Sequence, residues 1–253
     1  KNKNMIKQLT RYAALAFIVP IMVSCGSTSN SDIAKDDSTL YNMVNKDTQW
    51  VKLFDGQTLN GWHGYNKTDS AVTNWIVEDS SLVCLGAAEW DTGGDLVTDK
   101  EYENFELEWD WKINKGGNSG VMYHVVEDPK YKGPYETGPE YQMIDDAGWP
   151  GKLEDWQKTG ADYAMNLAHD KKKVNPVGEW NNSRIVFNNG HVEHWLNGEK
   201  IVEFQAWTDE WNKEKSTGKW KDFPDYGSAK KGKIALQDHG NRAYFKNIRI
   251  KEL

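Results

Sequence analysis

The sequence predicts an all-β protein built as a β-sandwich or jelly roll, and three observations support this. Residues 105–113 alternate apolar and charged side chains for nine positions, so one face of that strand is buried and the other faces solvent. Asn-Gly pairs at 189–190 and 197–198 supply the positive φ angles of tight hairpin turns. No helical pattern of useful length follows the N-terminal segment. About a dozen short, hairpin-linked strands in roughly 200 residues are typical of these architectures.

The N-terminal 25 residues are predicted to be a targeting segment. A basic start precedes an apolar stretch at 13–23, which is too short to span a bilayer. The stretch ends in Val-Ser-Cys-Gly, which resembles a bacterial lipobox and implies cleavage before Cys25 and lipidation of that cysteine. Residues 26–48 are predicted to be a flexible tether. We therefore expect a cell-envelope lipoprotein, held by its lipid anchor alone in the periplasm or at the outer-membrane surface of a Gram-negative bacterium. The alternative is an ordinary secretory signal with a chance cysteine.

The other strands are predicted from short β-branched and aromatic runs bounded by turn residues. In chain order they are 50–54, 75–77, 82–85, 95–98, 121–126, 141–144, 184–187, 192–196, 200–204, 233–237 and 244–251. The stretch 59–63 is predicted to be a turn. Residues 149–168 are predicted to be a long loop over one face of the fold, and 207–225 an insertion with a short helix.

Composition narrows the function classes. The net charge is −7, and no basic stripe is present, so a nucleic-acid partner is excluded. The chain has 13 Trp and 11 Tyr, and such an aromatic excess in a polar sequence suits a cleft that binds carbohydrate. Most of these rings are still expected in the core. Cys84 lies in an apolar run and is predicted to be a buried, unpaired thiol.

The polar residues that do not fit a purely structural strand gather at 116–146. Glu140 and Gln142 share one face of a predicted strand. A one-residue bulge after Gln142 would bring Asp145 to the same face. Two carboxylates in one cleft can acquire different pKa values and act as acid and base.

Three histidines are candidates for the base or for a metal site. In its predicted strand, His124 shares a face with Met122, away from the more apolar face. His239 ends a late strand, and His63 lies in a predicted turn. A neutral histidine can act as a general base near pH 7. His124, Glu140 and His239 would also suit a divalent metal ion, although the sequence requires no cofactor.

The chain resembles the 3-keto-disaccharide hydrolase family. The resemblance covers about 50–253 and rests on the segments LFDGQTLNGWHGY, FELEWDWKINKGGNSGVMYHV, GPEYQMIDD, GEWNNSRIVFNNGHVEHWLNG and IALQDHGNRAYFKNIRI. It implies one concanavalin A-like jelly roll of two curved antiparallel sheets, here residues 49–253. It also implies a carbohydrate substrate and cleavage of glycosidic bonds in 3-keto-glucosides or disaccharides.

The E-x-Q-x-x-D strand is also similar to the E-x-D-x-x-E strand of laminarinase-type glucanases, but the middle acid is replaced by Gln142. This departure argues against the double-displacement mechanism of those glucanases. It favours a mechanism in which a base removes the C2 proton beside a ketone, the C1 substituent is eliminated, and water then adds. The predicted catalytic residues are Glu140, His124, Asp145 and His239. The predicted substrate-binding residues are Asn118, Gln142, His63, Trp62, Asp146 and Gln237.

The alternative function is a non-catalytic carbohydrate-binding surface lipoprotein of a glycan-uptake system, because the fold supports both activities. A lectin does not need His124, Glu140 and His239 together. Convergence of these three side chains in one cleft is therefore the observation that separates the two functions.

Overall fold

A computed structural model of the chain describes residues 49–67, 72–86 and 94–253. The predicted signal peptide, Cys25 and the tether lie outside these residues. Within the described part, no helix combines the length and the apolar character that crossing a membrane requires.

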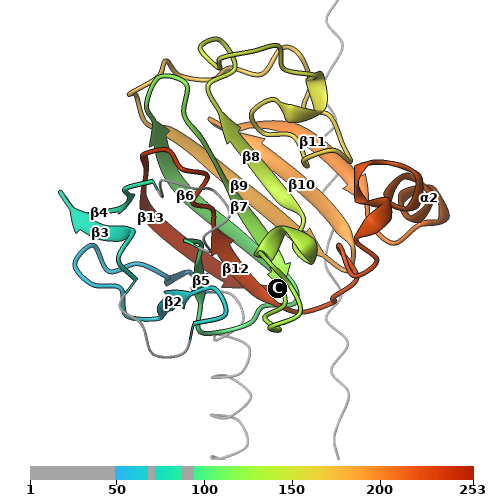
Figure 1. Cartoon of the computed structure of the whole chain (residues 1–253), viewed down its shortest axis with the longest axis horizontal. Coiled ribbons are helices and arrows are strands. Elements are labelled where there is room, and N and C mark those ends of the chain that lie inside the picture. Colours follow the sequence, from blue (N-terminus) through green and yellow to red (C-terminus); the bar gives the residue numbers. More distant parts are fainter. Residues whose placement is uncertain (1–48, 68–71, 87–93) are drawn as a thin grey trace, which may run out of the picture. The chain divides into compact units, whose positions relative to one another are not determined.

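Two antiparallel sheets stack on each other, which confirms the predicted fold class (Figure 1). The larger sheet has the order β11-β10-β9-β6-β13-β4-β3, and β1 also pairs with β13. Its strands are β1 (Val51–Lys52), β3 (Trp75–Glu78), β4 (Ser81–Cys84), β6 (Phe105–Ile113), β9 (Asn181–Asn188), β10 (His191–Leu196), β11 (Glu199–Gln205) and β13 (Ala243–Glu252). The smaller sheet has the order β2-β5-β12-β7-β8. Its strands are β2 (Trp62–Gly64), β5 (Leu96–Thr98), β7 (Asn118–Val125), β8 (Glu140–Ile144) and β12 (Lys233–Leu236).

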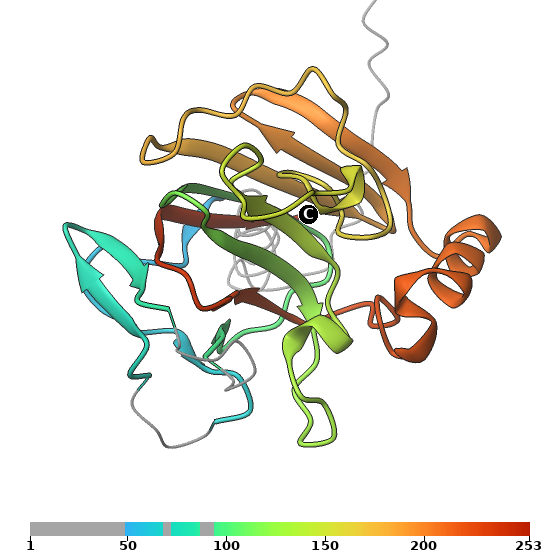
Figure 2. The same cartoon turned by 45° about the horizontal axis from the view of Figure 1, so that its top comes forward.

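The core lies between the two layers, which Figure 2 separates. On β6 the five apolar side chains are buried and the four charged ones are half-buried, as the alternation predicts. From the smaller sheet, Tyr141 and Met143 of β8 and Val121 of β7 fill the same core. The opposite face of β7 and β8 therefore holds Asn118, Glu140 and Gln142 away from the core.

The turns follow their residue types closely. Asn189 and Asn197 have φ of 51° and 49°, and the glycine after each has φ of 83°. These positive angles close the β9–β10 and β10–β11 hairpins with tight turns. Cys84 is buried and unpaired, as predicted.

Two predicted boundaries are wrong. The end of the turn predicted at 59–63 is instead the start of β2 (Trp62–Gly64), whose backbone pairs with β5 in the register Trp62↔Thr98 to Gly64↔Leu96. The strand predicted at 50–54 is limited to Val51–Lys52, whose register opposite β13 is Val51↔Ile250 and Lys52↔Arg249.

The outer face of the larger sheet is a ladder of charge pairs. Glu106 lies 2.9 Å from Lys251, and Glu108 lies 3.0 Å from Arg249. Asp110 accepts hydrogen bonds from two asparagine side chains. The carboxylates of β6 are thus neutralised in partly exposed positions, as expected for a solvated sheet face.

An insertion joins β11 to β12 and contains the helix α2 (Asp209–Thr217) and a 3₁₀ helix, η3 (Lys219–Asp222). Thr208 caps α2 by accepting a hydrogen bond from Trp211 N at 3.1 Å. The insertion and short helix were predicted, and Figure 1 shows α2 at the side of the sheets. Two further 3₁₀ turns are η1 (Pro134–Glu136) and η2 (Asp155–Gln157).

Candidate active site

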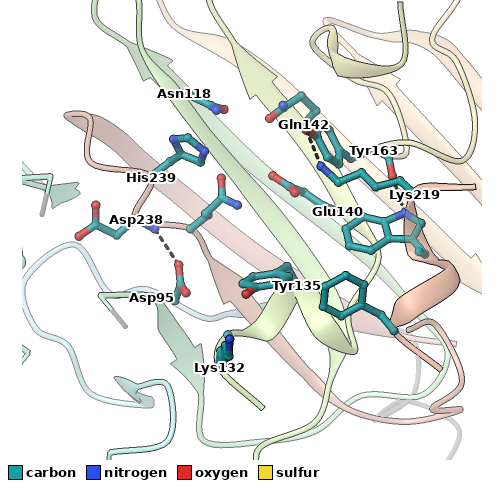
Figure 3. A pocket seen from close by; sticks show the side chains of 14 residues that line it. Asp95, Asn118, Lys132, Tyr135, Glu140, Gln142, Tyr163, Lys219, Asp238 and His239 are labelled. Carbon is teal, nitrogen blue, oxygen red and sulfur yellow. Dashed lines mark hydrogen bonds between the residues drawn. The ribbon is translucent and has the colours of Figure 1, made fainter. Parts of the chain in front are cut away.

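A pocket of about 300 Å³ opens on the outer face of the smaller sheet (Figure 3). The sheet supplies its floor, and segments 132–135, 163 and 219–223 supply its walls. Its lining residues are Asp95, Asn118, Lys132, Gly133, Tyr135, Glu140, Gln142, Tyr163, Lys219, Trp220, Phe223, Gln237, Asp238 and His239. Five of the predicted site residues are in this set: Glu140, His239, Asn118, Gln142 and Gln237.

Glu140 occupies the floor of the pocket. Its side chain lies across the backbone of β7 at Gly120, where a Cβ atom would come 2.1 Å from Glu140 Oε1. Only glycine leaves room for the carboxyl at this position. Burial raises the pKa of Glu140 to about 8, the Asp95 and Asp162 carboxyls add to the rise, and Lys219 opposes it. Because no ion pair to Glu140 forms within the described residues, its carboxyl is a neutral acid at pH 7.

His239 and Asp95 face the same pocket from the ends of neighbouring strands. Asp95 precedes β5, and its Oδ1 accepts a hydrogen bond from Asp238 N at 2.9 Å, which fixes the turn that carries His239. Burial lowers the pKa of His239, so its imidazole is neutral at pH 7. Burial also raises the pKa of Asp95 to about 7, while the bond from Asp238 N opposes that rise. The pocket therefore combines a neutral base with two weak acids.

For two amide oxygens of the pocket, the described part of the chain supplies no hydrogen-bond partner. They are Asn118 Oδ1 on β7 and Gln237 Oε1 just after β12, and both atoms are buried. By contrast, Gln142 Oε1 accepts a hydrogen bond from Met143 N at 3.0 Å. A buried acceptor without a donor is unfavourable until a ligand supplies one.

The wall opposite His239 is aromatic and comes largely from the β11–β12 insertion. Trp220 stacks on Tyr226 with ring centroids 4.1 Å apart and donates from Nε1 to the backbone oxygen of Tyr163 at 3.1 Å. Lys219 Nζ donates to the Tyr163 hydroxyl at 3.1 Å. Phe223 and Tyr135 complete the wall, edge to face with centroids 5.9 Å apart. Rigid aromatic faces beside polar groups suit a sugar ring.

His124 does not line the pocket, which corrects its predicted place beside Glu140. The register of β7 against β12 shifts between Met122 and Val125, and His124 itself has φ of 54°. This bulge turns both Tyr123 and His124 into the core, where the His124 ring lies 4.3 Å from that of Phe187. Its Nε2 bonds the backbone oxygen of Glu103 at 2.8 Å, and burial lowers its pKa to about 4. The predicted bulge in β8 is absent, since β7 and β8 pair without a shift.

Asp145 and Asp146 also lie outside the pocket. Asp145 follows β8 and ties a turn, because its carboxylate accepts from the backbone N–H of Gly116 and Gly148, each at 2.8 Å. Asp146 accepts from Thr159 N at 2.8 Å and pairs with Lys172 at 3.4 Å. Both aspartates therefore fix the loops at the far end of β8.

Trp62 and His63 are similarly placed elsewhere. The Trp62 ring is in the core, and its Nε1 donates to the backbone oxygen of Leu53 at 2.6 Å. His63 lies between Asp99, at 2.6 Å, and Glu127, at 3.0 Å, beside a different hollow. Strand alternation on β2 separates Trp62 from His63.

The predicted metal set does not assemble, because His124 is in the core while Glu140 and His239 are in the pocket. In the described ranges, one trio of His191, Glu193 and Glu203 has ligand atoms within 4.8 Å of one another. Lys200 Nζ already pairs with both of these glutamates, and the trio lies on the larger sheet.

Sequence reasoning missed several residues of the pocket. They are Asp95, Lys132, Gly133, Tyr135, Tyr163, Lys219, Trp220, Phe223 and Asp238. Asp238 directly precedes His239, and the density of aromatic residues at 207–225 is a signal that could have indicated the wall. Asp95 follows Gly93-Gly94 and carries no comparable signal.

Comparison with known proteins identifies the family of this chain. The sequence profile of the 3-keto-alpha-glucoside-1,2-lyase-like domain family matches residues 49–251. A protein of Bacteroides thetaiotaomicron named 3-keto-disaccharide hydrolase is 34% identical over 228 residues, covering 81% of this chain and 78% of that protein.

Two crystal structures of proposed glycosyl hydrolases from Parabacteroides distasonis are similar in fold and sequence. The first has a TM-score of 0.75 and 50% identity, and the match covers 81% of this chain and 94% of the other. The second has a TM-score of 0.62 and 30% identity, with 81% and 100% covered. These matches confirm the predicted family and support the prediction of a glycoside hydrolase. The chain belongs to the family of the 3-keto-alpha-glucoside-1,2-lyase-like domain.

Proposed function

We propose that this protein cleaves the glycosidic bond of 3-keto-glucosides or 3-keto-disaccharides by elimination and hydration. One observation carries the proposal: a single pocket holds a carboxyl whose pKa is raised to about 8 and an imidazole whose pKa is lowered. At neutral pH the first is a proton donor and the second a proton acceptor.

In the first step, His239 removes the proton at C2, which is acidified by the ketone at C3. The electrons of the C–H bond form the C2=C3 bond of an enolate, and the Glu140 acid donates a hydrogen bond to the enolate oxygen. A neutral buried carboxyl is well suited to this role, since it adds no negative charge beside the one that develops.

In the second step, the enolate returns to the ketone and expels the oxygen at C1, which takes a proton from Asp95. Water then adds to C1 of the enone while its released proton passes to the Asp95 carboxylate. The His239 imidazolium exchanges its proton with solvent and then protonates C2, so all three groups return to their starting states. The products are 3-keto-glucose and the free aglycone, so the net reaction is hydrolysis.

The decisive experiment is turnover of a 3-keto-glucoside and of its unoxidised parent in D₂O, with and without a chelator. Cleavage of the keto substrate alone, with one deuterium at C2 of the product, is the expected result. The product alone, incubated without enzyme, controls for spontaneous exchange. Cleavage without deuterium at C2 would replace elimination by direct hydrolysis. Loss of turnover in the presence of the chelator would show that the reaction requires a metal ion. Tight binding of oligosaccharides with no cleavage would favour the carbohydrate-binding alternative.

We also propose that the protein acts at the cell envelope, anchored through lipid on Cys25. The support is the apolar stretch and small residues before this cysteine. Mass spectrometry of the mature N-terminus tests it, and an unacylated N-terminus elsewhere in the chain would contradict it.

A further inference from the structure

The floor of the pocket has a feature that a general acid and base do not need. Three residues of the pocket lie next to Gly120 in the sheet: Asn118 on β7, Glu140 on β8 and Gln237 just after β12. Asn118 lies two residues before Gly120 on the same face of β7. The Glu140 carboxyl lies over Gly120, and Gln237 N donates to Gly120 O at 2.9 Å. We call these three residues the acceptor–acid–acceptor row.

Two members of the row are acceptors for which the described residues supply no donor. Asn118 Oδ1 and Gln237 Oε1 are buried, and neither has a partner within the described residues. Gln237 is held firmly, because its backbone oxygen also accepts from Ser119 Oγ at 2.7 Å. The Asn118 residue is only 6% exposed. Both oxygens are therefore buried acceptors that a ligand of the pocket can supply with donors.

A ligand that satisfies these three groups must offer two donors and one acceptor. A hydroxyl can donate, whereas a carbonyl can only accept. On a 3-keto-glucoside, the hydroxyls at C2 and C4 flank the carbonyl at C3.

We infer, resting on the proposed function, that the acceptor–acid–acceptor row recognises the hydroxyl–carbonyl–hydroxyl sequence of the oxidised sugar ring. Asn118 and Gln237 accept from the two hydroxyls, and the Glu140 acid donates to the carbonyl oxygen between them. The row is a specificity determinant as well as a support for the enolate. A site with fixed buried acceptors rejects ligands that lack the matching donors, because those acceptors then stay unpaired.

The inference is tested by binding alone, with a ligand that cannot be cleaved. The probe is 1,5-anhydroglucitol oxidised at C3, which keeps the C2 hydroxyl, the C3 carbonyl and the C4 hydroxyl but has no aglycone. Its 2-deoxy and 4-deoxy counterparts each lack one donor. Calorimetry with the wild-type protein should show each deoxy analogue binding on the order of 10- to 100-fold more weakly than the probe.

Variants then assign each hydroxyl to its partner. In Asn118→Leu one of the two deoxy penalties should disappear, and in Gln237→Met the other. Gln142→Leu is the matched control: its amide lies on the same sheet face, but its oxygen already has a donor, so both penalties should persist. Thermal unfolding checks that the variants fold, and the wild-type series needs no variant.

Two results would overturn the inference: deoxy analogues that bind the wild-type protein as tightly as the probe, or penalties that persist in both Asn118→Leu and Gln237→Met. The outcome is separable from that of the proposed function. Selective binding without cleavage of any glucoside refutes only the proposed reaction. Cleavage without the two penalties refutes only the recognition by the row.

Discussion

The outer faces of the two sheets carry the same kinds of acid in opposite states. On β6 of the larger sheet, Glu106 and Glu108 each have a cationic partner and remain partly exposed. On the smaller sheet, Glu140 is buried with no ion pair within the described residues, and its pKa rises to about 8. The position of a carboxylate in a strand therefore does not by itself indicate whether that carboxylate is charged or protonated. What its neighbours supply decides whether it is a solvated charge or a proton donor.

The largest expected difference between the two faces is in catalysis. Glu140→Gln and His239→Ala should each lower kcat/KM for a 3-keto-glucoside by about 10²- to 10⁴-fold, the usual contribution of a positioned acid or base. Glu106→Gln is the matched control from the larger sheet and should stay within about twofold. Steady-state kinetics measures all three. Retained activity in both pocket variants would remove them from the mechanism.

The second expected difference is in the pH dependence of kcat/KM. The rate should fall about tenfold per pH unit on the acid side, as His239 becomes protonated below the usual histidine pKa of 6.5. It should fall again above pH of about 8, as Glu140 loses its proton. Asp95, Asp238 and Lys219 face the same pocket, and Asp95, with a pKa of about 7, narrows the plateau. Loss of the Asp95 proton should give a first fall in rate above pH of about 7, which Glu140→Gln should keep. This variant should lose only the steeper fall above pH of about 8, whereas Glu106→Gln should keep both.

A third difference concerns stability, and its sign follows from the pKa. The native pKa of Glu140 is about 8, above its ordinary value of 4.5, so the native state holds this proton longer than the unfolded state. The contribution of protonated Glu140 to the free energy of unfolding is fully present below pH 4.5. It is lost as the pH rises from 4.5 to about 8. Glu140→Gln should therefore stabilise the protein at pH 8 by on the order of 1–3 kcal/mol. Denaturant unfolding at pH 4.5 and pH 8 measures the gain, which should vanish at the lower pH.

The smallest expected effect belongs to the charge ladder. Lys251→Met breaks the pair with Glu106 and should destabilise the protein by less than about 1 kcal/mol. The loss should shrink in high salt because the pair is partly exposed. A fall of several kcal/mol in the free energy of urea unfolding that does not depend on salt would contradict this prediction. It would show that the charges on the larger sheet are as strongly shielded from solvent as Glu140.

Much of the fold could be predicted from the sequence because its signals are local. The alternation at 105–113 and the Asn-Gly turns fix strands and hairpins from neighbouring residues alone. Glu140, Gln142 and Asn118 were found for the same reason, since two adjacent strands carry them on one face.

The errors arose where non-local pairing decides the outcome. His124 left the predicted face because β7, and not β8, has the bulge, and that bulge forms against β12 from more than one hundred residues later in the chain. Asp95 and the aromatic wall were missed because each is brought to the pocket by long-range packing. Asp145 resembled a catalytic acid, but its hydrogen bonds to the turn are visible only in three dimensions.

The insertion between β11 and β12 has a consequence for how the specificity of this fold can be changed. The catalytic floor is encoded in the sheet, whereas Lys219, Trp220 and Phe223 are encoded in one contiguous insertion with its own capped helix. Exchange of the segment would change the wall, but Trp211, Trp220 and Tyr226 within it belong to the core and would have to be kept. The sheet and much of the wall thus come from separate parts of the sequence. A library of residues 207–232 that keeps these core residues would test whether the wall selects the aglycone of the proposed substrate.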